Sequence, residues 1–294
     1  MIKYSIIIPH FNRPILVQKT IESFFDLKDK EIIIIIDDLS NEENLKILKK
    51  YISTIDKKHN VKLIENKEKF YLGQIRNIGI NLAKGYWIFF IDDDDWATKE
   101  FIDFLNNKKL NNKIDVYRFN YQLLNNENKV VWKVRNILIK SKMYSVQASS
   151  YLIKTSYLKE KQLFFPKEQL PYEDLQFNMN LYNTNPKTKQ IHIYSINYFL
   201  SENSILRSKV DKNKIISRID SILKEDSYNK KTYCLRLLVD FRKKFKKMNL
   251  EKDYKELVKR LDLKFIDFLR LNWFNFFLAI PTIYIFFKFK NEKN

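Results

Sequence analysis

Residues 86–96 read YWIFFIDDDDW, an apolar run that ends in four consecutive aspartates, Asp92 to Asp95. A run that is apolar throughout, without alternation, is typical of a strand buried on both faces of a sheet. Three similar apolar runs precede it, at residues 3–8, 31–36 and 61–64. Segments with helical spacing separate these runs. This order of strands and helices predicts a parallel sheet covered by helices on both faces.

The pattern changes after Trp96. The helices expected before it cover residues 14–25, 41–55 and 72–83, and one more is expected at 99–105. Beyond that helix, a hairpin (116–124 with 130–134) and two strands (149–154 and 190–200) are predicted. The whole is expected to be a Rossmann-like α/β fold in which a parallel half continues into a mixed sheet.

The length and composition of the chain limit the classes of protein to which it can belong. The chain has 294 residues, of which 45% are hydrophobic, and this is enough for a large folded core. The single cysteine, Cys234, excludes an internal disulfide. The apolar run at residues 6–8 is too short for the core of a signal peptide. We therefore expect a cytoplasmic protein.

Polar side chains follow three of the predicted strands, in residues 9–12, 37–40 and 92–95. Parallel strands present their carboxyl ends at one edge of a sheet, where ligands bind, so these clusters are expected to meet. Four adjacent carboxylates repel one another, and a Mg²⁺ or Mn²⁺ ion would relieve the repulsion. If strand geometry continues, Asp92 and Asp94 share one face. The alternative is a solvated acidic loop.

Five segments in one order resemble family 2 glycosyltransferases with the A-type fold. They are SIIIPHFN (5–12), DDLS (37–40), GQIRNIG (73–79), IDDDDW (91–96) and YEDL (172–175). The resemblance covers roughly residues 1–205. It implies a nucleotide-sugar-binding half (1–97) and an acceptor-binding half (98–205) of one catalytic domain. The resemblance does not cover the rest of the chain, where the spacing of apolar residues predicts a basic helical C-terminal region (206–294).

The resemblance also implies roles for individual residues. Asp174, with Glu173 beside it, would be the general base, and Asp94 would hold the metal together with Asp92. The nucleotide sugar would be bound by Pro9, Phe11, Asn12, Asp38, Arg76, Asp92 and Asp93. Other readings stay open at this point: a surface ion pair for Arg76, a turn for Asp38, and helix capping for Glu173 and Asp174.

The activity implied by the resemblance is transfer with inversion, dependent on Mn²⁺ or Mg²⁺. The donor would be a UDP-sugar (galactose, N-acetylhexosamine or glucose), and the acceptor a hydroxyl of a lipooligosaccharide, capsule or lipid-linked oligosaccharide. The sequence departs from the family at two points. Relatives usually have an Arg or His shortly before a Ser at the end of the last strand, and residues 198–204 contain neither. The basic residue that helps to bind the diphosphate would then be either missing or supplied by Arg207. Leu39 stands where glycine is common. His10 would either contact the nucleotide or pack within its loop.

The C-terminal region carries much of the formal net charge of +19, because residues 205–294 hold 23 basic and 11 acidic residues. An apolar, aromatic run at 273–287 follows these lysines. Basic helices followed by apolar residues suit the surface of an anionic membrane, so we expect peripheral attachment to the inner face of the bacterial inner membrane. Packing on the catalytic domain and a membrane span are alternatives. Oligomerisation is possible.

Two other classes of protein were weighed against a glycosyltransferase. A metal-dependent nucleotidyltransferase normally has a Gly-rich or Lys-rich phosphate loop near the first strand, and residues 9–12 are not one. A basic nucleic-acid-binding protein would carry its charge on the rim of the sheet, whereas the rim expected here is acidic. We therefore expect no nucleic-acid partner.

Overall fold

The computed structural model describes residues 2–36, 39–68, 70–134, 147–167 and 173–199, with isolated positions at 220, 256 and 259. The chain divides into two compact units, residues 1–138 with 144–206, and residues 139–143 with 207–294. Every described helix and strand belongs to the first unit. The helices predicted after residue 206 and the apolar run at 273–287 lie outside the described residues. None of the described helices has both the length and the apolar character needed to cross a bilayer.

The parallel half of the sheet is confirmed. Its strands are β1 (Tyr4–His10), β2 (Lys30–Ile36), β3 (Val61–Glu65) and β4 (Trp87–Phe90), in the order β3-β2-β1-β4. The register pairs Tyr4 with both Lys30 and Trp87. The helices α1 (Pro14–Glu22), α2 (Glu42–Thr54) and α3 (Leu72–Leu82) form the crossovers, as expected, and a short 3₁₀ helix, η1 (Lys57–His59), precedes β3.

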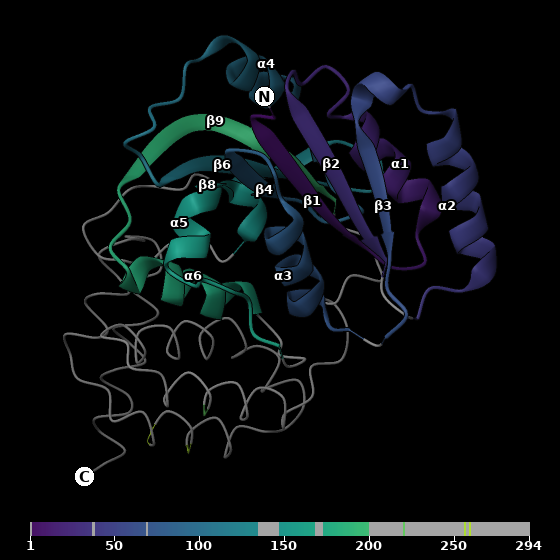
Figure 1. The fold of residues 1–294 in the computed structure, drawn as a ribbon. Coiled ribbons are helices and arrows are strands. Elements are labelled where there is room, and N and C mark those ends of the chain that lie inside the picture. The colour runs from purple at the N-terminus through teal and green to yellow at the C-terminus, as the bar shows by residue number, and fades with distance from the viewer. Residues whose placement is uncertain are drawn as a thin grey trace. The chain divides into compact units, whose positions relative to one another are not determined.

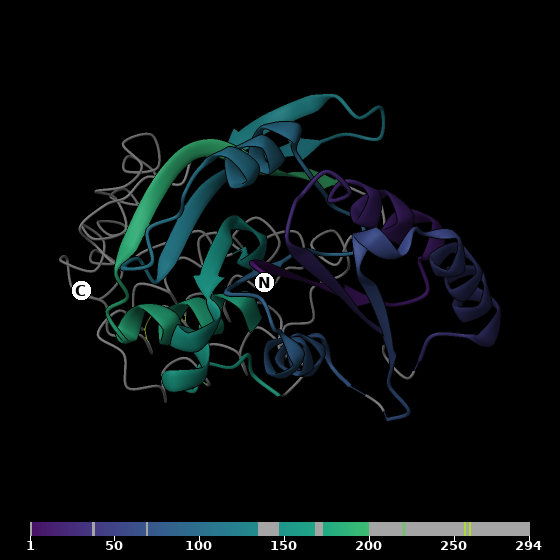
Figure 2. The ribbon, with the colours of Figure 1, turned by 45° about the horizontal axis from the view of Figure 1, so that its top comes forward.

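The mixed half extends the same sheet beyond β4 (Figure 1). Its order is β8 (Tyr151–Lys154), β6 (Val116–Leu124), β9 (Thr188–Phe199) and β5 (Trp96–Ala97), and β7 (Val130–Val134) forms the predicted hairpin with β6. Its helices are α4 (Lys99–Asn107), α5 (Thr155–Glu160), α6 (Glu173–Asn183) and the 3₁₀ turn η2 (Ala148–Ser150). β5 and α5 were not predicted. Figure 2 shows β6 and β9 curving together.

The core lies on both faces of the sheet, as the apolar strands require. Along β4, Phe89 packs on one side and Ile88 and Phe90 pack on the other. The first face is covered by α1, α2 and α4, and the second by α3, α5 and α6. Both faces of β1 and β4 are buried, which removes the strands from water. Because the two strands pair in parallel, their carboxyl ends lie at one edge of the sheet.

The three glycines stand where neighbouring atoms leave no room for a side chain. Backbone conformation does not require glycine at these positions, because none of the three has a positive φ angle. At Gly85 an added Cβ would lie 2.4 Å from the backbone nitrogen of Ser5, on β1. Left-handed positions are taken by other residues, and four of the six described are asparagines: Asn12, Asn60, Asn128 and Asn185. Asparagine tolerates this conformation better than most side chains do.

We predict that Gly85→Ala lowers the free energy of unfolding by about 1–3 kcal/mol, because the new methyl group meets the main chain of β1, which cannot move aside without disturbing the sheet. Chemical denaturation followed by circular dichroism measures the change. Asn81→Ala, at an exposed position of α3, is the matched control and should be neutral or slightly stabilising. Equal stability of the Gly85→Ala and wild-type proteins would contradict the close packing.

Candidate active site

The predicted site residues that the structure describes come from three places in the fold. β1 and β4 are neighbours, and the segments that follow them, residues 11–13 and 92–95, begin at the same edge of the sheet (Figure 1). Helix α3 contributes Arg76, and the first turn of α6 contributes Glu173 and Asp174. Asp38 lies outside the described residues, as do Tyr172 and Arg207.

Arg76 connects the turn that follows β4 to the first turn of α6. Its side chain is only 3% exposed, and its guanidinium contacts three carboxylates. One terminal nitrogen lies 2.6 Å from Asp174 Oδ1 and 3.1 Å from Glu173 Oε1, and the other lies 2.8 Å from Asp92 Oδ1. These carboxylates outweigh burial and raise the pKa of Arg76. The surface ion pair considered for this residue is therefore wrong: the cluster is largely buried.

Asp174 is held on both oxygens. Its second oxygen accepts a hydrogen bond of 3.2 Å from the backbone N–H of Ala148, in η2. Burial raises the pKa of Asp174 to about 7, although the positive charge of Arg76 acts to lower it. The carboxylates of Glu173 and Asp92 also raise this pKa. A carboxylate with a pKa near neutrality can exist both with and without its proton under ordinary conditions.

The four aspartates fall into two classes by burial. Asp93 is 4% exposed and Asp95 is wholly buried, whereas the side chains of Asp92 and Asp94 are 35% and 17% exposed. The predicted division into two pairs is thus present, but continued strand geometry is not its cause. β4 ends at Phe90, and the backbone N–H of Asp95 donates to the carbonyl of Asp92, which closes a turn.

The carboxylate of Asp93 ties the turn to the end of β1. It lies 2.8 Å from His10 Nδ1, accepts from the backbone N–H of Phe11 at 3.3 Å, and lies 3.2 Å from the guanidinium of Arg13. His10 is almost fully buried, so of its two expected roles the structure shows packing within the loop. Asp93 thereby holds in place a loop that borders the site.

Asp94 and Asp95 differ in their partners. Asp94 lies 2.5 Å from the Arg13 guanidinium, yet burial and the neighbouring Asp92 raise the pKa of Asp94 to about 6. Asp95 accepts from the backbone N–H of Phe199, at the end of β9, and burial together with Asp92 and Asp94 raises its pKa well above the ordinary value. Asp95 therefore braces β9 against the turn.

Asn12 connects the loops that follow β1 and β2. Its side-chain oxygen accepts from the backbone N–H of Asn41 at 2.8 Å and from the side chain of Asn44 at 3.3 Å, and its amide donates to the carbonyl of Leu39. Pro9 is buried near the carboxyl end of β1, and Phe11 is 37% exposed. Asn12 thus holds residues 39–41, the described neighbours of Asp38.

Sequence reasoning missed two groups of the site. Arg13 contacts Asp93 and Asp94, and the backbone N–H of Ala148 contacts Asp174. Arg13 directly follows residues 9–12 in the loop after a predicted strand, so the argument that selected those residues could have suggested it. No pattern in the sequence indicates the Ala148 contact, because it depends on how η2 packs beside α6.

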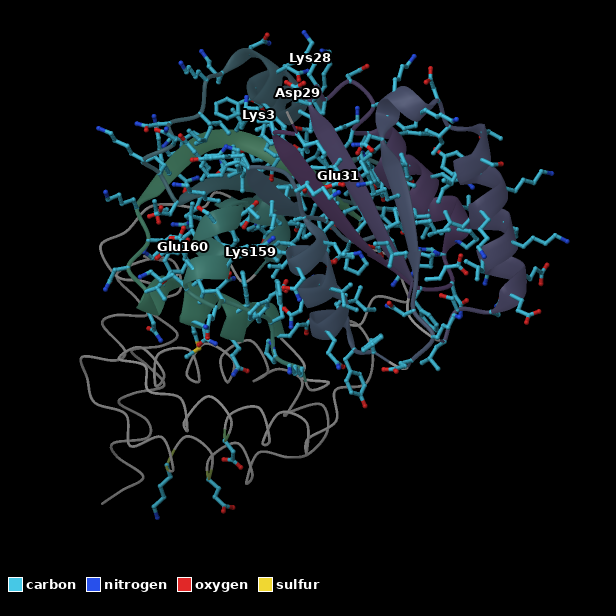
Figure 3. All side chains as sticks on the ribbon, in the orientation of Figure 1. Lys3, Lys28, Asp29, Glu31, Lys159 and Glu160 are labelled. Carbon is cyan, nitrogen blue, oxygen red and sulfur yellow. The ribbon has the colours of Figure 1, made fainter. Side chains whose placement is uncertain are left out.

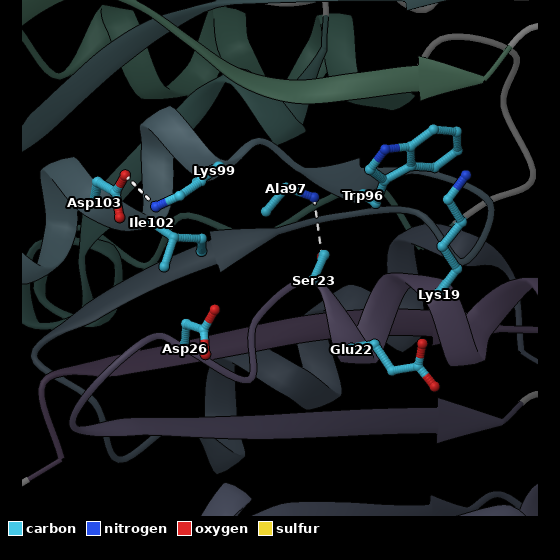
Figure 4. Close-up of a pocket in the computed structure, with 9 residues that line it drawn as sticks. All are labelled: Lys19, Glu22, Ser23, Asp26, Trp96, Ala97, Lys99, Ile102 and Asp103. Atoms are coloured by element: carbon cyan, nitrogen blue, oxygen red, sulfur yellow. Dashed lines mark hydrogen bonds and ion pairs between the residues drawn. The ribbon is translucent and has the colours of Figure 1, made fainter. Parts of the chain in front are cut away.

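A cavity of about 420 Å³ lies elsewhere in the fold, beside α1, β5 and α4. Lys19, Trp96 and Asp103 are among its lining residues, and none of the predicted site residues lines it (Figure 4). Lys99 and Asp103, which also line it, form an exposed ion pair. The cavity is therefore separate from the carboxylate cluster around Arg76.

Solved structures with the same architecture are A-type glycosyltransferases. Staphylococcus aureus TarS 1–349, in complex with UDP-GlcNAc, matches with a TM-score of 0.58 at 19% identity, over 88% of this chain and 83% of that one. The mannosyltransferase PcManGT from Pyrobaculum calidifontis, in complex with GDP-Man and Mn²⁺, matches with a TM-score of 0.56 at 9% identity, over 88% and 72%. The predicted A-type fold is thus confirmed.

The amino-acid sequence also matches known proteins. A poly(ribitol-phosphate) beta-glucosyltransferase of Bacillus spizizenii is 32% identical over 189 residues, which are 61% of this chain and 29% of that protein. The chain thus spans about a third of the length of the curated relatives it matches first. The sequence model of the family described as "Glycosyl transferase family 2" matches residues 5–174, which are more than half of the chain. The protein therefore belongs to glycosyl transferase family 2.

Proposed function

We propose that this protein is an inverting glycosyltransferase that moves a sugar from a UDP-sugar to a hydroxyl of a bacterial surface glycan. The observation that carries the proposal is the contact of one guanidinium, that of Arg76, with Asp92 and with Asp174. Asp92 follows β4, on the side expected to bind the donor, and Asp174 begins α6, on the side expected to bind the acceptor. The family match favours this function over nucleotidyl transfer and nucleic-acid binding.

Asp174 is the proposed general base. The acceptor hydroxyl loses its proton to Asp174 as its oxygen attacks the anomeric carbon, and the bond from that carbon to the nucleoside diphosphate breaks. Attack opposite the leaving group inverts the configuration, so an α-linked donor gives a β-linked product. A pKa of about 7 suits this task, because about half of such groups are free of the proton at neutral pH, and the unprotonated form accepts a proton readily.

Asp94 and Asp92 are the proposed holders of a divalent cation. The described residues contain no group of three or more side chains that could ligate a metal, so this part of the chain would supply two carboxylates, those of Asp92 and Asp94. This fits Mg²⁺ or Mn²⁺, which proteins often bind through one or two carboxylates, with substrate phosphates and water completing the shell. When bound, such an ion stabilises the negative charge that develops on the departing diphosphate.

The acceptor is proposed to be an anionic surface glycan, such as a capsule, lipooligosaccharide or lipid-linked oligosaccharide that carries phosphate. The formal net charge of +19 supports this choice, since a strongly basic protein attracts a polyanion. The Bacillus spizizenii relative is named for a poly(ribitol-phosphate) acceptor, which is of that class. The proposed attachment to an anionic membrane surface rests on the basic residues and the apolar run after residue 205.

We predict that Asp174→Asn lowers kcat by about 10²–10⁴-fold and leaves the affinity for UDP within about twofold of wild type. The amide keeps the shape of the side chain but cannot take a proton. Transfer from a panel of UDP-sugars measures the rate, and calorimetry with UDP and Mn²⁺ measures binding. Asp103→Asn, which removes an exposed carboxylate from α4, is the control and should be fully active. A fully active Asp174→Asn enzyme would show that Asp174 is not the base.

The pH dependence of the wild-type enzyme offers an independent check. Asp174 must have lost its proton to act as a base, so kcat/KM should rise with pH and level off above about 7. Below that pH the rate should fall about tenfold per pH unit. Initial rates in buffers of constant ionic strength and saturating Mn²⁺ measure the profile. A profile that is flat from pH 5 to pH 8 would be incompatible with the proposed base.

A further inference from the structure

Arg13 is a basic residue of the site that the proposed mechanism does not use. It lies between the end of β1 and the start of α1, and its guanidinium is 2.5 Å from Asp94 and 3.2 Å from Asp93. Its side chain is 43% exposed, so it reaches the carboxylates from the solvent side of the loop. A positive group thus already occupies the carboxylate that the proposed function assigns to a divalent cation.

Like charges compete for one carboxylate. A divalent cation on Asp94 and a guanidinium in contact with the same side chain repel each other, and each weakens the attraction of the other. Within the described part of the chain, no basic side chain other than Arg13 lies within ion-pair distance of Asp94. We propose that Arg13 serves as the counter-cation of Asp94 in the free protein and must leave it when a divalent cation binds. This inference rests on the proposed function.

The two arginines at the acidic turn differ in their freedom to move. Arg76, on Asp92, is 3% exposed and contacts Glu173 and Asp174 as well, so withdrawing it would remove the positive charge that three carboxylates share. Arg13 can swing into water at little cost, because it is exposed. Arg13 is therefore the group that exchanges, while Arg76 stays on Oδ1 of Asp92, so that Asp92 would reach the cation through Oδ2.

The other partner of Arg13 does not depend on it. Asp93 also contacts His10 and the backbone N–H of Phe11, both of which remain when Arg13 withdraws. When Arg13 withdraws, Asp94 loses its ion-pair partner and can bind a cation in its place. The loop that holds the site therefore keeps its shape while one guanidinium leaves, which suits an exchange of cations without refolding.

The exchange makes a distinctive prediction: removing a positive charge should tighten cation binding. For Arg13→Gln, the apparent Kd for Mn²⁺ without nucleotide should fall about fivefold, because the cation no longer displaces an ion pair. Arg13→Lys keeps the charge and should stay near wild type. Titration of free Mn²⁺ by electron paramagnetic resonance measures the Kd on the full chain. An unchanged or higher Kd for Arg13→Gln would overturn the proposal.

Lys28→Gln is the matched control, since it removes the same charge from the opposite end of the sheet. Lys28 is exposed and precedes β2 at the amino ends of the strands (Figure 3). The Lys28→Gln variant should have the same Kd for Mn²⁺ as wild type, because solvent screens a distant surface charge. A fivefold fall in the Lys28→Gln variant as well would overturn the proposal, because general charge would then explain the effect.

Asp94→Asn separates this inference from the function on which it rests. If Asp94→Asn weakens Mn²⁺ binding and Arg13→Gln leaves it unchanged, the inference fails and the proposed cation site stands. If Asp94→Asn binds Mn²⁺ as tightly as wild type, the assignment of the cation to Asp94 fails, and the role of Arg13 fails with it. Thermal melting of each variant without metal shows that the compared proteins are folded.

Discussion

The side chain of Arg76 is almost wholly withdrawn from water and yet contacts the carboxylates of Asp92, Glu173 and Asp174. A buried guanidinium loses its hydration, and it is stable only where carboxylates replace the lost water. Each carboxylate gains in turn from the one positive charge that they share. The relative position of the turn after β4 and the start of α6 therefore depends on this cluster, and so does the distance between the proposed base and the proposed donor side.

Burial divides the four adjacent aspartates, because a folded protein cannot bury four carboxylates without partners. Asp93 contacts His10 and the backbone N–H of Phe11, and one carboxylate oxygen of Asp95 accepts from the backbone N–H of Phe199. These two hold the turn against β1 and β9. Asp92 and Asp94 keep some exposure and face arginines. The division lets one short segment support the fold through two of its carboxylates and leave the other two for the proposed cation.

The elements with strong patterns were predictable. Runs such as residues 86–91 contain no polar residue, and such a strand is stable only when helices cover both of its faces, so the parallel half followed from composition and order. Short elements escaped prediction, and β5 and α5 are two of them. β5 has two residues and exists because Trp96 and Ala97 pair with β9, while α5 has six residues, too few for a helical period to show.

The sequence alone determines the family and the identity of the acidic residues, because both are carried by its motifs. It also predicts that the polar strand ends lie at one edge of the sheet, because strand order dictates which ends meet. Only tertiary structure decided which charges touch. Arg76 and Asp174 are 98 positions apart, and no periodicity reports on their 2.6 Å contact. Whether Asp95 was buried and whether Arg13 lay on Asp94 likewise depended on packing between segments. Local pattern determines which face a side chain occupies, whereas the distance between two faces is set by everything packed between them.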